Sequence, residues 1–163
     1  MSSTLRALAG IGMAIAFSGI LHAQGLVTQR NLSLALAKTI AEEALAHCKA
    51  KGYRTSAVVV DRAGDVLVML RDEEATSQVA EMARRKAYTA RMFRTTTAEF
   101  QKRTADPGYD AQRDIHDILA LGGGVPIKVG DETVGGVGSA GSTQALDDEC
   151  AKAGVEKAAE YLK

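Results

Sequence analysis

The fold is decided by the stretch Ser56-Ala-Val-Val-Val-Asp61-Arg-Ala-Gly64-Asp65-Val66-Leu-Val-Met-Leu-Arg71. Its two halves, residues 56–60 and 66–71, are rich in valine and other large apolar residues, which favour extended strands. Between them, Asp61, Gly64 and Asp65 are residues that tight turns prefer. The stretch therefore predicts a β-hairpin.

A second stretch of the same kind lies nearer the C-terminus. It reads Gly122-Gly-Gly-Val-Pro-Ile-Lys-Val129, then the tight turn Gly130-Asp131-Glu132, then Thr133-Val-Gly-Gly-Val-Gly138. Pro126 has no backbone N–H to donate, so we expect it at the start of a strand or in an edge strand. This stretch predicts a second β-hairpin.

Four other segments carry apolar residues at helical spacing. Ser33 is the expected N-cap of the first, and Thr96 with Glu99 resembles the capping box of the third. Tyr161 and Leu162 close the apolar stripe of the last one. The predicted helices are residues 33–51, 77–93, 96–103 and a final helix that follows Ser142.

The order of elements is helix, hairpin, two helices, hairpin and helix. Two hairpins without long alternation of strands and helices favour an antiparallel sheet covered by helices. We therefore predict an α+β fold and not a Rossmann-like one. Residues 104–121 show no clear periodicity and are expected to form a long excursion, and such loops often carry function.

The N-terminal residues are typical of an export signal. Arg6 precedes an apolar run from Leu8 to Leu21, which is followed by the small residue Ala23. The run falls short of the roughly 20 apolar residues that a membrane span needs. We predict a secretory signal peptide over residues 1–23, a single domain over 24–163, a periplasmic or secreted location and no stable membrane span after cleavage.

Charge and composition exclude several classes of function. Loss of residues 1–23 removes one arginine and no acid, which leaves 19 Lys and Arg against 20 Asp and Glu. A domain this close to neutrality has no electrostatic basis for binding nucleic acid. The glycine-rich segments lack the Gly-Lys-Ser/Thr ending of a phosphate-binding loop, so no nucleotide is expected.

The two cysteines, Cys48 and Cys150, both lie in the predicted exported part. An oxidising compartment makes a disulfide between them chemically accessible. They fall at the end of the first predicted helix and the start of the last, and antiparallel packing of these helices would bring the thiols within bridging distance. Two buried free cysteines are the alternative.

Lys86 stands on the apolar stripe of the middle predicted helix. A lysine in such a position needs a partner or a path to solvent. It either snorkels, pairs with an acid such as Asp61, or holds the carboxylate of a ligand.

His47 and His116 are the two histidines that remain after export. His47 is expected at the surface. His116 lies in the long excursion, where it either serves as a single axial ligand to the iron of a flat macrocycle or is an exposed histidine without a role. No nucleophile and base are readable, so no catalytic residue is assigned.

Five motifs in order resemble those of the GlcG/HbpS heme-binding family, which is related to the C-terminal domain of PduO-type corrinoid adenosyltransferases. They are Val58-Val-Val-Asp61-x-x-Gly64, Arg71 with the acids after it, Arg85-Lys86-Ala-Tyr-Thr-Ala90, Gly123-Gly-Val-Pro-Ile127, and Val134-Gly-Gly-Val-Gly-Ser-Ala-Gly141 with Asp147-Asp-Glu-Cys-Ala151. The resemblance implies a profilin-like fold with an antiparallel sheet of about five strands flanked by helices on both faces. It also implies a homo-oligomer.

The resemblance also bears on individual residues. Lys86 and Thr89 fall on the shared Lys-Ala-x-Thr-Ala segment. An iron-binding Glu-x-x-Glu of the exported family member would align with Glu81 and Arg84, so its second glutamate is absent here. This departure argues against iron binding by that motif.

The leading hypothesis is an exported, oligomeric protein, accessory to or associated with a sensor, that binds heme or a similar tetrapyrrole. His116 is the predicted metal ligand, and Lys86 or Arg91 is predicted to neutralise the propionates. Tyr88 and Thr89 complete the predicted cofactor-binding set.

Two other readings stay open. In the first, the protein is an enzyme or accessory factor acting on a small carboxylic metabolite, with Lys86 as anion anchor or general acid. In the second, it is an oligomeric partner of another exported protein.

Overall fold

The computed structural model describes residue 25 and residues 27–163, so the predicted signal peptide lies outside the described residues. Two hairpins and four α-helices form the framework, as expected. The elements are α1 (Leu34–Ala50), β1 (Ser56–Val60), β2 (Val66–Arg71), α2 (Ser77–Phe93), α3 (Thr97–Arg103), the 3₁₀ helix η1 (Asp110–Asp114), β3 (Gly124–Val129), β4 (Glu132–Ala140), α4 (Gln144–Lys157) and the 3₁₀ helix η2 (Ala159–Tyr161).

The four strands form one antiparallel sheet in the order β2-β1-β4-β3. The predicted hairpins are confirmed as the pairs β1–β2 and β3–β4. They are joined along β1 and β4, from Ser56 opposite Ala140 to Val60 opposite Gly136. Pro126 lies in the edge strand β3, as expected. The described residues thus form four strands, close to the expected five.

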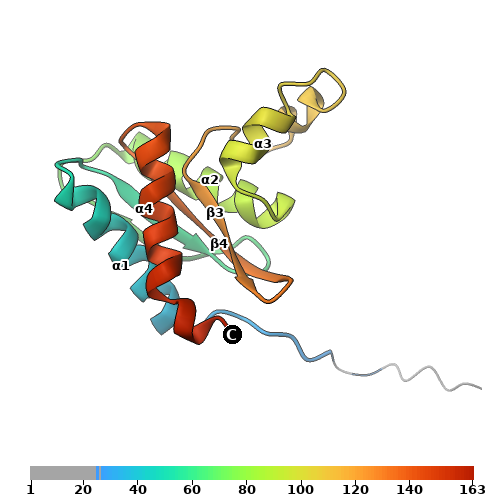
Figure 1. Cartoon of the computed structure of the whole chain (residues 1–163), viewed down its shortest axis with the longest axis horizontal. Helices are drawn as coiled ribbons and strands as arrows, with labels where there is room; N and C mark the ends of the chain where they lie inside the picture. Colours follow the sequence, from blue (N-terminus) through green and yellow to red (C-terminus); the bar gives the residue numbers. More distant parts are fainter. Residues whose placement is uncertain (1–24, 26) are drawn as a thin grey trace, which may run out of the picture.

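Helices cover both faces of the sheet, which confirms the predicted α+β class. In Figure 1, α1 and α4 run side by side over one face, and α2 lies behind the sheet. The larger apolar core lies under α1 and α4 and includes Val59, Ile127 and Val137. Val58 and Val60 point to the other face and pack against α2. The sheet is therefore buried on both sides, which explains why β1 reads as a continuous apolar run.

Helix α2 lies unusually close to β4 because the strand presents glycine to it. A Cβ atom on Gly138 would overlap the carbonyl oxygen of Ala83, and one on Gly136 would overlap that of Ala87. Gly124 on β3 faces the backbone of Lys86 in the same way. The glycine-rich segments of the sequence therefore serve helix-on-strand packing.

Local sequence signals account for the ends of the helices. Ser33 accepts a hydrogen bond from the amide of Leu36, and Thr96 forms a capping box with Glu99. The last helix ends earlier than its apolar stripe indicates. It stops at Lys157, and Tyr161 lies exposed in η2, so the expected burial of Tyr161 is wrong.

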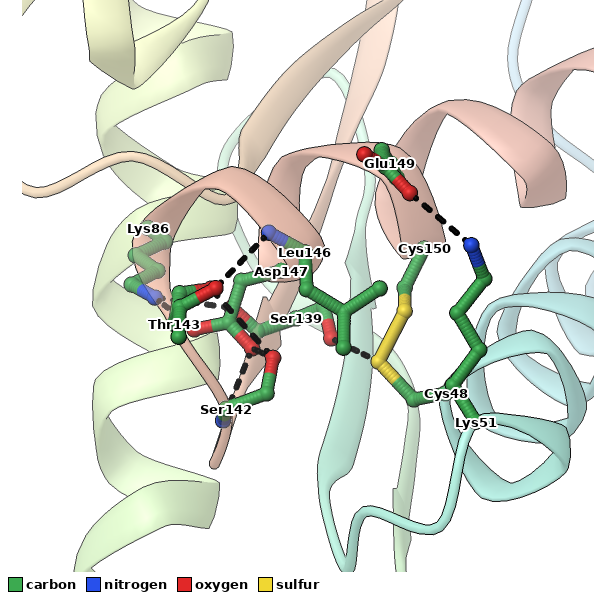
Figure 2. The surroundings of a disulfide bond; sticks show 10 residues. All are labelled: Cys48, Lys51, Lys86, Ser139, Ser142, Thr143, Leu146, Asp147, Glu149 and Cys150. Atoms are coloured by element: carbon green, nitrogen blue, oxygen red, sulfur yellow. Dashed lines mark hydrogen bonds and ion pairs between the residues drawn. A yellow bond between two sulfur atoms is a disulfide. The ribbon is translucent and has the colours of Figure 1, made fainter.

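Cys48 and Cys150 form a disulfide in the structure, with their Cα atoms 5.7 Å apart. Figure 2 shows the bond between the end of α1 and the middle of α4. Sγ of Cys48 also lies 3.7 Å from Oγ of Ser139 on β4. The bond closes a sequence separation of 102 residues and ties the two helices on this face together.

Replacement of Gly138 by alanine tests the close approach of α2 to β4. Gly138→Ala should lower the free energy of unfolding by about 1–3 kcal/mol or more, because the new methyl group overlaps backbone and not a flexible side chain. Urea unfolding measures the change. Gly108→Ala is the matched control, since a Cβ there meets only the side chain of Asp106. Equal stability of the two variants would contradict the packing.

A thiol count tests the disulfide. The unreduced protein, unfolded in denaturant, should show no free thiol. The variant Cys48→Ala/Cys150→Ala should lose about 2–4 kcal/mol, because the bond no longer restricts the unfolded chain. Two free thiols in the unreduced protein would rule the bond out.

Candidate functional site

Lys86 and Asp147 form a buried ion pair between α2 and α4. Nζ of Lys86 donates to Oδ2 of Asp147 at 2.7 Å and to the carbonyl oxygen of Ser139 at 2.9 Å. The other carboxylate oxygen of Asp147 accepts from the amide and hydroxyl of Ser142. The two side chains are 1% and 3% exposed. Figure 2 shows this network beside the disulfide.

The ion pair shows which acid is the partner of Lys86. Its acid is Asp147 and not Asp61, whose carboxylate instead accepts from the amides of its own turn. Burial lowers the pKa of Lys86, and the charge of Asp147 offsets part of that effect. A ligand carboxylate would have to displace Asp147, so the ligand-binding role of Lys86 stays a prediction.

His116 lies in a surface hollow of about 370 Å³ between α2 and the excursion 104–121. Its imidazole is exposed, and Nδ1 lies 3.3 Å from Oδ2 of Asp117. The residues that line this hollow, here called the histidine hollow, are Glu81, Arg85, Arg113, Asp114, Ile115, His116 and Asp117.

Arg84 fixes the position of Asp117. Its guanidinium donates to Oδ1 of Asp117 at 2.7 Å and to both carboxylate oxygens of Glu81. These bonds hold the pKa values of Asp117 and Glu81 below their usual range. Asp117 adopts a left-handed backbone conformation, with φ of 68°. The arginine that replaces the expected second glutamate thus connects α2 to the loop beside His116.

The other predicted cofactor residues are not gathered around His116. Thr89 is buried, donates to the carbonyl oxygen of Arg85 and accepts from the amide of Leu119, so it secures the end of the excursion. Tyr88 packs against the β1–β2 turn at Gly64. Arg91 lines a different hollow, toward the C-terminal end of α2. Their roles as cofactor ligands stay predictions.

Sequence reasoning missed three residues of the histidine hollow, namely Arg85, Arg113 and Asp117. Arg85 donates to the carbonyl oxygen of Ile118 while its Nε has no hydrogen-bond partner. Arg113 bonds to Thr104 and to the carbonyl oxygen of Gln101. Asp117 could have been predicted, because it follows His116 directly in the sequence. Arg85 and Arg113 could not, because their place beside His116 depends on how the excursion folds against α2.

In the part of the chain that the structure describes, three or more His, Cys, Asp or Glu side chains nowhere gather as a metal site. Within the same residues, every helix is too short or too polar to cross a bilayer.

A family model described as "Haem degrading protein HbpS-like" matches residues 32–156. Among curated proteins, a 15.0 kDa protein encoded between dhaT and dhaS in Citrobacter freundii is 31% identical over 120 residues, which cover 71% of this chain and 84% of that protein.

Solved structures of HbpS and of a related domain are also similar to this chain. A structure of HbpS is 36% identical with a TM-score of 0.77, covering 80% of this chain and 92% of that one. A double mutant of Streptomyces reticuli HbpS is 32% identical with a TM-score of 0.78, covering 94% and 97%. A complex named PduOC:Heme shares the fold at 22% identity, with a TM-score of 0.70 and coverage of 77% and 94%.

A double-mutant cycle tests the pair of Lys86 and Asp147. Lys86→Met should cost about 3–5 kcal/mol, because it leaves a buried carboxylate without its cation. The double variant Lys86→Met/Asp147→Leu should lose less than the sum of the two single variants. The exposed pair Lys38 and Glu42 is the control, for which we expect a coupling of about 0.5 kcal/mol. Additive losses at Lys86 and Asp147 would contradict the pairing.

Proposed function

Since the chain belongs to the HbpS-like family of haem-degrading proteins, we propose that it binds heme or a similar tetrapyrrole at the histidine hollow. His116 is the proposed axial ligand of the iron. The heme in the PduOC complex, at the level of fold alone, supports a tetrapyrrole as the ligand class.

The contact between His116 and Asp117 carries this proposal. A histidine that ligates a metal usually presents its other ring nitrogen to a carboxylate, which fixes the tautomer and the ring orientation. Asp117 lies beside Nδ1, so the proton is favoured there and Nε2 keeps its lone pair for iron. Arg84 holds Asp117 in place, so the fold fixes the carboxylate beside the exposed imidazole.

Other residues of the histidine hollow suit the propionates and the apolar macrocycle of heme. Arg85 and Arg113 line the hollow, and arginine binds carboxylates such as heme propionates well. Nε of Arg85 is buried without a partner and is a donor that a bound carboxylate satisfies. Ile115 is 52% exposed and offers an apolar surface to a macrocycle. The volume, about 370 Å³, lies at the low end for ligand pockets, so the ligand remains partly open to solvent.

Heme supplies an iron centre that takes an axial imidazole, and the protein supplies the ligand and its orientation. In this proposal His116 binds, Asp117 holds the proton at Nδ1, and Arg84 positions Asp117. Arg85 and Arg113 provide the positive charge. Arg91 lies outside the histidine hollow, so we assign the propionates to Arg85 and Arg113 in its place.

Export, oligomer formation and an accessory or sensor-associated role belong to the same proposal. The composition of residues 1–23 and the disulfide support export. The edge strand β2 exposes Val66 and Met69, a surface that a second copy of the chain can cover. The sensor-associated role rests on the family resemblance alone.

Hemin titration of the purified protein tests the proposal. The Soret band should shift and saturate with added protein. His116→Ala should change the position of the band and weaken binding, because the axial bond is lost. Arg84→Met should weaken binding by about tenfold while the band keeps its position, since it releases Asp117 but leaves the imidazole.

His47→Ala is the matched control, because His47 lies at the end of α1 and outside the histidine hollow. It should titrate like the unchanged protein. Absence of both a Soret shift and saturation would overturn heme binding. An unaltered spectrum in His116→Ala would overturn the assignment of the axial ligand.

A further inference from the structure

A second hollow lies at the other end of α2, against the turn between β3 and β4. It has a volume of about 160 Å³. Three arginines line it, one from the β1–β2 turn and two from the C-terminal end of α2, together with residues of the β3–β4 turn and of β4. The lining residues of this hollow, here called the arginine hollow, are Arg62, Arg91, Arg94, Asp131, Glu132 and Thr133.

The acids of the arginine hollow leave two of its arginines without an ion-pair partner. Glu132 is shared by Arg62 and by Arg30, whose Nη2 lies 2.6 Å from its Oε2. Asp131 is exposed on the turn, where solvent screens its charge. Among residues 25 and 27–163, neither Arg91 nor Arg94 has a carboxylate within ion-pair distance.

Two polar atoms in the lining are buried and lack a hydrogen-bond partner. They are Nε of Arg91 and Oγ1 of Thr133, and Thr133 is only 6% exposed. A buried donor without a partner costs about 1–3 kcal/mol. Two such atoms on the wall of one hollow indicate that an external acceptor completes them.

The charge around Arg91 points the same way. Burial lowers the pKa of Arg91, the neighbouring charges of Arg62 and Arg94 lower it further, and the charge of Asp61 offsets part of this effect. The partial negative charge at the C-terminal end of α2 accounts for one nearby cation. It does not account for three guanidiniums around one hollow or for the unpartnered hydroxyl of Thr133.

We propose that the arginine hollow binds a small, doubly charged oxyanion, either a phosphate group or a dicarboxylate. Arg91 and Arg94 supply the charge and the paired N–H donors, and Thr133 donates its hydroxyl. The site is separate from the histidine hollow, because the two share no lining residue. Arg91 lies six residues beyond Arg85, about 9 Å along the helix axis. This gives Arg91 an anion-binding role, with a small ligand in place of a heme propionate.

Calorimetric titration of the purified protein with inorganic phosphate and with malonate, at constant ionic strength against chloride, tests the site. At least one of the two dianions should bind saturably. Preference for phosphate assigns the site to a phosphate group, and preference for malonate assigns it to a dicarboxylate. Arg91→Met should weaken binding by about tenfold or more, and Thr133→Val by several-fold.

Lys38→Met removes one positive charge from the exposed surface of α1 and should leave the affinity unchanged. His116→Ala should also leave it unchanged, so a failure of heme binding and a failure of this site are distinguishable. If Arg91→Met does not fold, Arg94→Met at the exposed end of the helix makes the same test. No saturable binding of either dianion, or equal affinity in the arginine variants, would overturn the proposal.

Discussion

The close approach of α2 to β4 is the constraint on which the rest of the structure depends. Gly136 and Gly138 on the strand let the backbone of the helix rest directly on the sheet. A side chain at either position would push α2 away from the sheet and would displace the site residues that α2 carries. The helix that carries Arg84, Arg85 and Arg91 is therefore placed by backbone contact and not by flexible side chains.

An ion pair and a disulfide fix the helices α4 and α1 on the other face of the sheet. The Lys86–Asp147 pair connects α2 to the start of α4 past the end of the sheet, and the disulfide connects α4 to α1. Ser139 lies between them in Figure 2: its carbonyl oxygen accepts from Lys86 and its hydroxyl contacts Cys48. A buried ion pair contributes little net stability by itself, but separating its partners is costly. The pair therefore acts mainly to fix how α2 and α4 lie relative to each other.

The sequence predicts what depends on local pattern and misses what depends on distant contacts. The hairpins, the caps at Ser33 and Thr96 and the long α2 follow from short-range signals. The junction of β1 with β4 and the partner of Lys86, 61 residues away, are set by packing that no local window contains.

The candidate site also combines residues that the local sequence indicates with residues that only distant contacts bring together. His116 was recognisable as a histidine in a loop, but its neighbours Arg85 and Arg113 meet it only because the excursion folds back on α2. Lys86 and Thr89 share a short motif and Arg91 follows it, yet the three face different surroundings, since a helix turns its side chains through 360° in 3.6 residues. Figure 1 shows α3 and the excursion projecting from the sheet. The lack of periodicity in residues 104–121 predicted an excursion there, but not how it folds against α2.

The most direct measurement of the central claim is a crystal structure of the protein grown with hemin. The proposal predicts iron bound to Nε2 of His116, with the backbone of the loop around His116 unchanged and Asp117 still bonded to Arg84. Iron held by another residue, or a tetrapyrrole bound away from the histidine hollow, would contradict it.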